Sequence, residues 1–273
     1  MRHLALLLAG LSIAACAPVT SPGAPLASSE QTALAAAVAN PARSEANRAR
    51  DRFRNPQATL AFFGVRPNHT VVELFPGGGW YSEILAPYIL NGGGTLYVAA
   101  PSQQGFTGFR RLVERDAGLY GRARQVTFPV REAGQTGVPA GSADAVLTFR
   151  NVHNWAMGEK PYADLAFQQI YAMLKPGGVL GIEEHRLPES ADSAREKTSG
   201  YLKVSTVRRL AEQAGFRFVG SSEINANPRD TADWPQGVWT LPPVLRLGEQ
   251  DRAKYLAIGE SDRMTLKFVK PAR

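Results

Sequence analysis

A short apolar segment followed by three consecutive glycines places the strongest constraint on the fold. Residues 70–74, Thr-Val-Val-Glu-Leu, have the apolar and β-branched composition of a strand buried on both faces. A glycine-rich turn at 75–79 and a helical stretch over 80–89 follow. Glycines in such a turn permit positive φ angles and let a ligand approach the backbone closely. The segment therefore predicts the first strand, turn and helix of a ligand-binding α/β sheet.

Strand and helix patterns alternate along most of the chain after residue 70. Strands are expected at 70–74, 95–99, 124–130, 143–148, 179–183, 216–224 and 264–270, and helices at 80–89, 108–121, 162–174 and 205–214, the last capped by Ser205. This alternation predicts an α/β fold, with a Rossmann-like, doubly wound, mostly parallel seven-stranded sheet and helices on both faces. In such sheets ligands bind beyond the carboxyl ends of the strands, where the strand order reverses.

The segment 225–262 departs from this alternation. It contains four prolines and two tryptophans, Trp234 and Trp239, before a polar helix from about Glu249. A connection of this length is usually functional or partly disordered. We expect the tryptophans either to form a lid over the site or to plug the domain with apolar surface. The chain is thus divided into helices at 30–64 and a main domain at 65–273 that carries this insertion.

The first 29 residues are expected to lie outside the folded domain. Arg2 precedes an apolar run over 4–15, which has the length of a signal-peptide core and is too short to span a bilayer. Small residues come directly before Cys16, the only cysteine, as they do in the lipobox of bacterial lipoproteins. We therefore predict a signal peptide at 1–15, a lipidated Cys16 with a flexible tether at 16–29, and an exported protein at the periplasmic face of the envelope. The alternatives are an ordinary signal peptide cut elsewhere, and an uncleaved anchor or a cytoplasmic protein.

The resemblance to lipoproteins also indicates a membrane. Ala17, rather than Asp, follows the cysteine, which favours the outer membrane in the lipoprotein families that this segment resembles.

The chain has a formal net charge of +7, with five arginines between residues 43 and 54. Nucleic-acid binding requires a basic stripe joined to a recognisable binding motif, and the sequence has no such motif. We expect these arginines to form a solvated helix face near anionic lipid, and no nucleic-acid partner.

Five motifs resemble those of the class I S-adenosylmethionine-dependent methyltransferases and occur in the same order. They are Val71–Gly79, Ser142–Leu147, Arg150–Trp155, Leu174–Leu180 and Ala214–Phe216. The resemblance covers nearly all of the chain from about residue 55. It is greatest to a group of predicted exported bacterial methyltransferases that share the ELFPGGGW turn and an LKFVKP-like last strand. It implies S-adenosyl-L-methionine as the cofactor, bound by Glu73, Phe75, Pro76, Gly77, Gly78, Gly79, Ala100, Glu132, Arg150 and Asn151.

Three positions bear on how this resemblance applies to the cofactor site. Phe75 replaces the first glycine of the family turn, and its ring either crowds the methionine end of the cofactor or packs beneath the loop. Ala100 stands where the family carries an acidic residue for the ribose hydroxyls, and Glu132 is the candidate for the acidic residue that meets adenine. A ribose hydroxyl without a partner weakens binding by roughly 1–3 kcal/mol. The polar residues 102–104 are the nearest replacements in the sequence.

Candidate catalytic groups follow the fourth and fifth strands. His153 comes after the fourth strand, and Glu184 and His185 end the fifth. A histidine beside a carboxylate can remove a proton from a methyl acceptor near pH 7. The alternative is that both histidines are structural and hydrogen-bond the loops. The three residues are also of the types that bind divalent metal ions, but no further spaced ligand is evident, so we expect a site without metal.

Three functions are consistent with these features. The first is an exported methyltransferase that acts on a small-molecule acceptor in the cell envelope, although S-adenosylmethionine is made in the cytoplasm. The second is a non-catalytic envelope binding protein that keeps the methyltransferase fold. The third is an enzyme of different chemistry on the same fold, because a fold does not fix a function. Aromatic residues near the turn, such as Trp80, Tyr81 and Trp155, either line an acceptor site or adenine pocket or, as is more usual, pack in the core. The mixture of aromatic and polar residues there favours a small molecule over a nucleic acid.

Overall fold

The computed structural model describes residues 25–272 of the chain. The expected signal peptide, Cys16 and most of the tether therefore lie outside the described residues. Among the residues that are described, no helix is long and apolar enough to cross a membrane.

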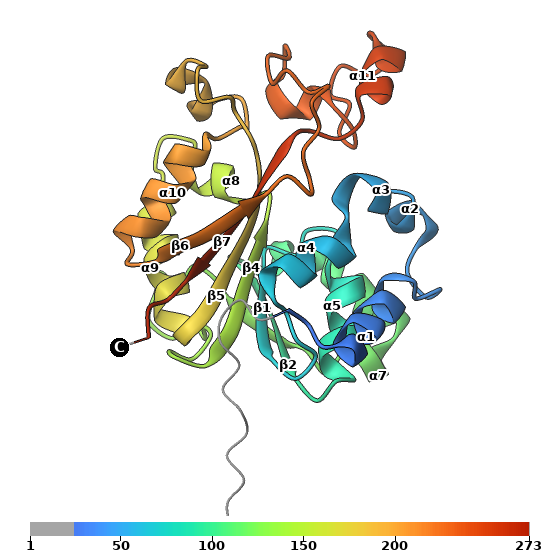
Figure 1. Ribbon diagram of the computed structural model, residues 1–273, viewed down its shortest axis with the longest axis vertical. Helices are drawn as coiled ribbons and strands as arrows, with labels where there is room; N and C mark the ends of the chain where they lie inside the picture. The colour runs from blue at the N-terminus through green and yellow to red at the C-terminus, as the bar shows by residue number, and fades with distance from the viewer. Residues whose placement is uncertain (1–24, 273) are drawn as a thin grey trace, which may run out of the picture.

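A seven-stranded sheet runs through the molecule (Figure 1). Its strands are β1 (Thr70–Leu74), β2 (Thr95–Ala100), β3 (Arg124–Thr127), β4 (Ala143–Phe149), β5 (Leu174–His185), β6 (Arg217–Ser222) and β7 (Arg263–Val269). They lie in the order β3-β2-β1-β4-β5-β7-β6. The first five strands are parallel, and β7 is antiparallel to both β5 and β6. The predicted doubly wound α/β fold is confirmed, and the strand order reverses between β1 and β4.

Helices cover both faces of this sheet (Figure 1). One face carries α1 (Ser28–Val38), α4 (Pro56–Phe63), α5 (Ser82–Leu90), α6 (Thr107–Arg115) and α7 (Ala117–Tyr120). The other face carries α8 (Val152–Ala156), α9 (Ala163–Met173) and α10 (Val204–Gln213). Side chains of β1 alternate between the two cores, with Val71 in one and Val72 and Leu74 in the other. This period of two is that of a strand buried on both faces, as its composition predicts.

Two strand boundaries differ from the sequence prediction. β5 begins at Leu174, because the Lys-Pro-Gly-Gly segment expected as a turn is the first part of the strand. A register shift opposite the start of β4 accommodates it. β3 ends at Thr127 rather than at 130, because Pro129 has no N–H with which to continue the ladder.

Two helix predictions are also corrected. Ser205 does not cap α10, which begins at Val204, and its hydroxyl instead donates a 2.6 Å hydrogen bond to Glu189. The helix expected at 108–121 is divided at Asp116, whose carboxylate accepts a hydrogen bond from the Leu119 N–H and so starts α7. Ser205 thus bonds a distant carboxylate instead of its own helix, whereas Asp116 forms a local cap that interrupts the predicted helix.

The insertion over 225–262 forms a structured layer that includes η3 (Gly237–Thr240) and α11 (Arg252–Ile258). Figure 1 shows α11 at the same end of the molecule as two short N-terminal helices, α2 (Glu45–Arg48) and α3 (Asp51–Arg54). The buried Asp230 carboxylate holds the layer together, because it accepts hydrogen bonds from Tyr201 Oη, Trp234 Nε1 and the Asp262 N–H. Trp234 packs edge-on against Tyr255 inside this layer, so it acts as an apolar plug.

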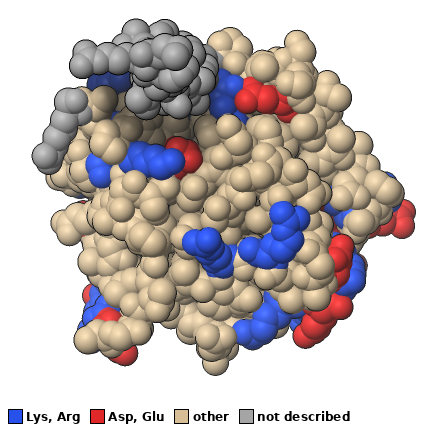
Figure 2. Space-filling model, turned by 90° about the horizontal axis from the view of Figure 1, so that it is seen from below, with Lys and Arg blue, Asp and Glu red and all other residues tan. Residues whose placement is uncertain are grey.

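Basic side chains are dispersed on the face that Figure 2 shows. Lys and Arg lie there in separate groups, and several are beside Asp or Glu. A continuous basic stripe, which nucleic-acid binding requires, does not run across this face.

Candidate functional site

A cavity of about 360 Å³ lies at the carboxyl ends of β1, β4 and β5, where the strand order reverses. Its walls come from the glycine turn after β1, the residues that end β4 and β5, the segment of α2 and α3, and the insertion. Trp239, Leu241 and residues 242–244 of the insertion form an apolar cover. Trp239 is therefore the tryptophan that takes the lid position. Sheets of this kind bind their ligands at this place.

The three glycines of the turn have different structural roles. Gly77 and Gly79 have φ angles of 57° and 82°, which residues with side chains rarely adopt. A Cβ on Gly79 would lie 2.7 Å from Leu112, so this glycine allows α6 to pack against the turn. Gly78 has an ordinary φ and is exposed, and a Cβ there would meet no atom within 4 Å. Gly78 therefore keeps the backbone open toward the cavity.

Phe75 packs beneath the loop, which was one of its two expected positions. Its ring centroid lies 6.2 Å from that of Phe128, edge-on, and 5.9 Å from that of Trp155. The residue also lines the cavity. Its φ of 52° is a left-handed conformation that costs a non-glycine residue about 1–2 kcal/mol. The aromatic contacts offset this cost and let Phe75 occupy a position that suits glycine.

The carboxyl group of Glu73 lies below the turn, and Glu73 does not line the cavity. It is buried, and its Oε2 accepts a 2.6 Å hydrogen bond from Ser82 Oγ at the start of α5. Burial raises the pKa of Glu73 to about 7, although the hydrogen bonds from Ser82 act in the opposite direction. Glu73 connects the end of β1 to α5, and its contact with a ligand stays a prediction.

The ends of β2 and β3 lie outside the cavity. Ala100 is buried, and a Cβ on Gly105 would lie 2.7 Å from the Ala100 Cβ, so the short helix η1 (Gln103–Phe106) packs directly onto the end of β2. Glu132 is exposed beyond β3. Of the cofactor residues expected from the sequence, the structure brings together six around the cavity, namely Phe75, Pro76, Gly77, Gly78, Arg150 and Asn151.

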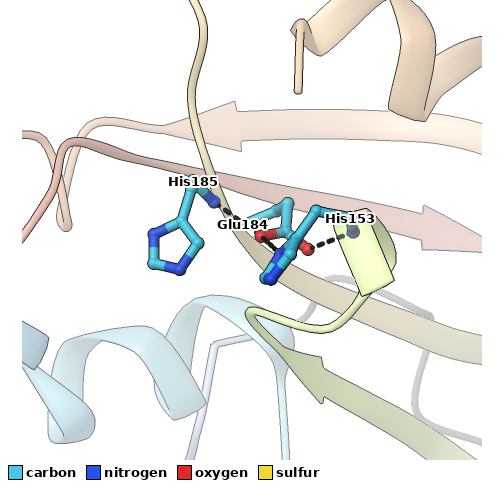
Figure 3. A group of neighbouring side chains, drawn as sticks. All are labelled: His153, Glu184 and His185. Carbon is cyan, nitrogen blue, oxygen red and sulfur yellow. Dashed lines mark hydrogen bonds and ion pairs between the residues drawn. The ribbon is translucent and has the colours of Figure 1, made fainter. Parts of the chain in front are cut away.

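The expected catalytic residues His153, Glu184 and His185 lie side by side (Figure 3). β4 and β5 are parallel, so the start of α8 lies beside the end of β5. Glu184 Oε1 is 2.8 Å from His153 Nδ1 and accepts a 2.8 Å hydrogen bond from the His185 N–H. Its Oε2 accepts a 3.1 Å bond from the His153 N–H. Because a carboxylate only accepts, Nδ1 of His153 carries a proton, and in the neutral imidazole Nε2 is then the nitrogen with the lone pair.

His185 is the second imidazole of the cavity. Its Nδ1 lies 2.6 Å from Ser261 Oγ, and its ring centroid is 5.2 Å from that of His153. Burial and the neighbouring His153 and Arg150 hold the pKa of His185 well below the usual 6.5, so this ring is neutral. Trp239 meets the His153 ring edge-on, with centroids 6.2 Å apart, and so covers the pair from the side of the insertion.

The same three side chains form a set that can hold a metal ion, since one donor atom of each lies within 4.8 Å of the others. Both oxygens of Glu184, however, accept hydrogen bonds from His153 and His185. The positive charges of Arg54, Arg150 and Arg263 lower the pKa of His185, and they oppose a divalent cation in the same way. The arrangement suits proton transfer better than metal binding, and the expected absence of a metal stays a prediction.

Glu260 is the centre of a buried group of arginines beside the cavity. It accepts hydrogen bonds from Arg50 Nε at 2.6 Å, Arg54 Nε at 3.0 Å and Arg263 Nη1 at 3.3 Å. Burial alone would raise the pKa of Glu260, but these cations lower it to about 2. Arg50, Arg54 and Glu260 all line the cavity, and none of them is a site residue predicted from the sequence.

The expectation of a solvated arginine face over 43–54 is wrong for two of its members. Arg43 and Arg54 are only 2% and 3% exposed. Arg43 pairs with Asp51 through both terminal nitrogens at 2.7 and 2.8 Å. The guanidinium groups of Arg43 and Arg54 also lie over the Trp80 ring, at 5.3 and 4.8 Å from its centroid, respectively. Carboxylate and aromatic partners from other segments therefore compensate for the loss of water.

No protein-family model and no curated protein matches this sequence. Solved structures do match. A SAM-dependent methyltransferase from Aquifex aeolicus is 15% identical and superposes with a TM-score of 0.53 over 81% of this chain and 93% of its own. The chain has the methyltransferase fold. The cyclase SpnF, 17% identical, gives a TM-score of 0.57 over 93% and 99% of the two chains.

A third match on the methyltransferase fold contains the cofactor. Phosphoethanolamine N-methyltransferase 2 from Haemonchus contortus, in complex with S-adenosyl-L-methionine, is 17% identical and gives a TM-score of 0.52 over 80% of this chain and 53% of its own. Identities this low establish the fold alone. The cyclase among the matches is named for a different reaction, so the activity must be argued from the site.

Proposed function

We propose that this protein transfers the methyl group of S-adenosylmethionine to an acceptor bound in the cavity. The proposal is carried by one observation: the glycine turn after β1 and His153, whose ring is held by Glu184, line the same cavity. The turn offers a backbone that a cofactor can approach, and the pair offers a nitrogen that can take the acceptor's proton. The Aquifex aeolicus and Haemonchus contortus proteins, which share the fold, are both named as methyltransferases, and this agrees with the proposal.

The cavity fits one half of the cofactor better than the other. Gly77 and Gly78 leave space for the methionine part along the turn. At the end of β2, Ala100 provides no acceptor for the ribose hydroxyls. The exposed polar residues 102–104 are the side chains that follow directly, and we assign the ribose contact to them. This lack of a carboxylate is the one observation that favours the alternative of a non-catalytic binding protein.

Residues of the cavity would remove a proton from the acceptor and hold it in position. Glu184 fixes the ring and the tautomer of His153, so that Nε2 is the nitrogen that accepts a proton. Trp239, in the apolar cover, packs against the buried His153 ring and shields it from water, which strengthens the electrostatic interaction of His153 with Glu184. The bound cofactor would supply the methyl group. The cavity would hold the acceptor in line with it.

Replacing His153 by glutamine is expected to lower the rate of S-adenosylhomocysteine formation by about 10²–10⁴-fold, the usual worth of a general base. The rate is measured with the full-length protein, S-adenosylmethionine and a small-molecule extract of the producing cells, so the acceptor need not be known. His69→Gln is the matched control, because His69 lies next to the amino end of β1 and does not line the cavity. Equal rates in wild type and His153→Gln would exclude His153 as the base.

We also propose that the protein acts in the cell envelope, on a small molecule, while a lipidated Cys16 holds it at the membrane. The apolar run at 4–15 and the small residues before Cys16 support export and lipidation. A cavity of about 360 Å³ with polar and aromatic walls supports a small acceptor. The full-length protein is expected in the membrane fraction, and Cys16→Ser is expected to leave it. If both proteins fractionate alike, the cysteine is not the anchor.

A further inference from the structure

We infer that one wall of the cavity binds an anionic group, a carboxylate or a phosphate, of the cofactor or of the acceptor. This arginine wall consists of Arg50, Arg54 and Arg150, which all line the cavity. The first two belong to the α3 segment, and the third follows β4. Which molecule carries the anion rests on the proposed methyl transfer, whereas the anion site itself does not.

Positive charge exceeds negative charge around the arginine wall. Arg263 adds a fourth guanidinium group behind it, and the carboxylates that accept hydrogen bonds from the four arginines are Glu183 and Glu260. Glu184, the next carboxylate along β5, is turned toward the two histidines. Burial and the charge of Arg150 lower the pKa of Arg54 to about 9, which agrees with an excess of positive charge. Buried charges need partners of opposite sign. The excess positive charge of the arginine wall would therefore be balanced by a bound anion.

The wall also has hydrogen-bond donors that the described residues leave unused. Nη2 of Arg50 is buried and has no hydrogen-bond partner among them. Arg54 is almost fully buried, and the hydrogen bond found for it in the described part of the chain engages only Nε. Arg150 donates to Glu183 through Nη1, at 3.1 Å. The planar fork of N–H groups on a guanidinium matches two oxygens of a carboxylate or phosphate, which a neutral ligand cannot replace.

Two features hold the arginine wall in place. The Trp80 ring lies 4.8 Å from the Arg54 guanidinium and supports it without neutralising its charge. Arg150 has a φ of 60°, a left-handed conformation that side chains rarely adopt and that is found at ligand sites. The donors are therefore positioned before a ligand arrives, as a built recognition site requires.

Titration calorimetry of inorganic phosphate into the full-length protein tests the anion site. We expect saturable binding in the millimolar range that is weakened about tenfold or more in Arg150→Gln and in Arg54→Gln. Arg150 is the milder change, because its side chain is 19% exposed. Arg111→Gln is the control, since Arg111 is exposed on α6 and should bind phosphate like the wild type. Equal phosphate affinity in the wild type and in both wall variants would overturn the inference.

Two further titrations identify the molecule that carries the anion. S-adenosylhomocysteine has an amino-acid carboxylate, and 5′-methylthioadenosine is a related nucleoside without it. If S-adenosylhomocysteine displaces phosphate and methylthioadenosine does not, the wall binds the cofactor's carboxylate. If phosphate binds equally well with S-adenosylhomocysteine present, the wall binds the acceptor, which then carries the anionic group. Phosphate binding without any binding of S-adenosylhomocysteine would leave the anion site intact and remove the proposed methyl transfer.

Discussion

Replacing Glu260 by alanine is expected to destabilise the protein by about 3–5 kcal/mol, the cost of breaking a buried ion pair from one side. Glu260 is 4% exposed and accepts hydrogen bonds from three arginines. Arg54 would lose the carboxylate that it bonds, and Glu183 would be the one carboxylate that Arg263 still bonds among the described residues. Urea unfolding measures the loss. Glu249→Ala is the control, because that side chain is 89% exposed and its pair with Arg252 should contribute little.

The pKa of Glu260 gives the same magnitude and a pH dependence. A pKa of about 2 in the folded protein, against the ordinary 4.5, corresponds to about 3 kcal/mol. Because the folded pKa is the lower one, this stability is fully present above pH 4.5 and is lost as the pH falls through 2. The difference between wild type and Glu260→Gln should therefore shrink below pH 4.5. A difference that stays constant down to pH 3 would mean that the carboxylate does not stabilise the cluster.

Placing leucine at Gly78 is expected to weaken S-adenosylmethionine binding by about 100-fold or more, while the free energy of unfolding changes by about 0.5 kcal/mol at most. Gly78 lines the cavity, has an ordinary φ, and a Cβ there meets no atom within 4 Å, so a leucine is accommodated at the cavity wall without strain. Gly220→Leu is the matched control, because Gly220 in β6 is equally unhindered and lies outside the cavity. Unchanged affinity in Gly78→Leu would place the cofactor elsewhere.

The sheet could be predicted from the sequence because its signals are local. The apolar run at 70–74 coincides with β1, and glycines and prolines separate the later strands from the helices. The predicted boundaries of helices and strands were less accurate where a side chain or backbone segment bonds a partner that is distant in the sequence. Ser205 bonds Glu189 instead of capping its helix, and the Leu174 segment pairs with the start of β4 instead of turning.

The candidate site could be predicted only where it follows from strand ends. His153 and Glu184 are in contact because His153 follows β4 and Glu184 lies near the end of β5, the neighbouring parallel strand. The pairing of Arg54 with Glu260 joins residues 206 positions apart, and nothing in either local sequence indicates it. The arginines at 43–54 have the composition of a solvated helix, and only the tertiary structure shows which of them are buried.

Glu73 and Ala100 show a further limit of motif-based assignment. Both occupy cofactor positions by resemblance, yet Glu73 is bonded to Ser82 below the turn and Ala100 is covered by η1. A motif identifies the end of a strand, but the packing around that end determines whether a side chain reaches the cavity.

Titration calorimetry of S-adenosylmethionine into the wild-type full-length protein tests the proposed methyl transfer most directly. We expect saturable binding in the micromolar range that is retained in Gly220→Leu and lost in Gly78→Leu. Absence of binding by the wild type at millimolar S-adenosylmethionine would contradict methyl transfer, and would leave a binding protein on the methyltransferase fold whose cavity, with Ala100 at the end of β2, takes another ligand.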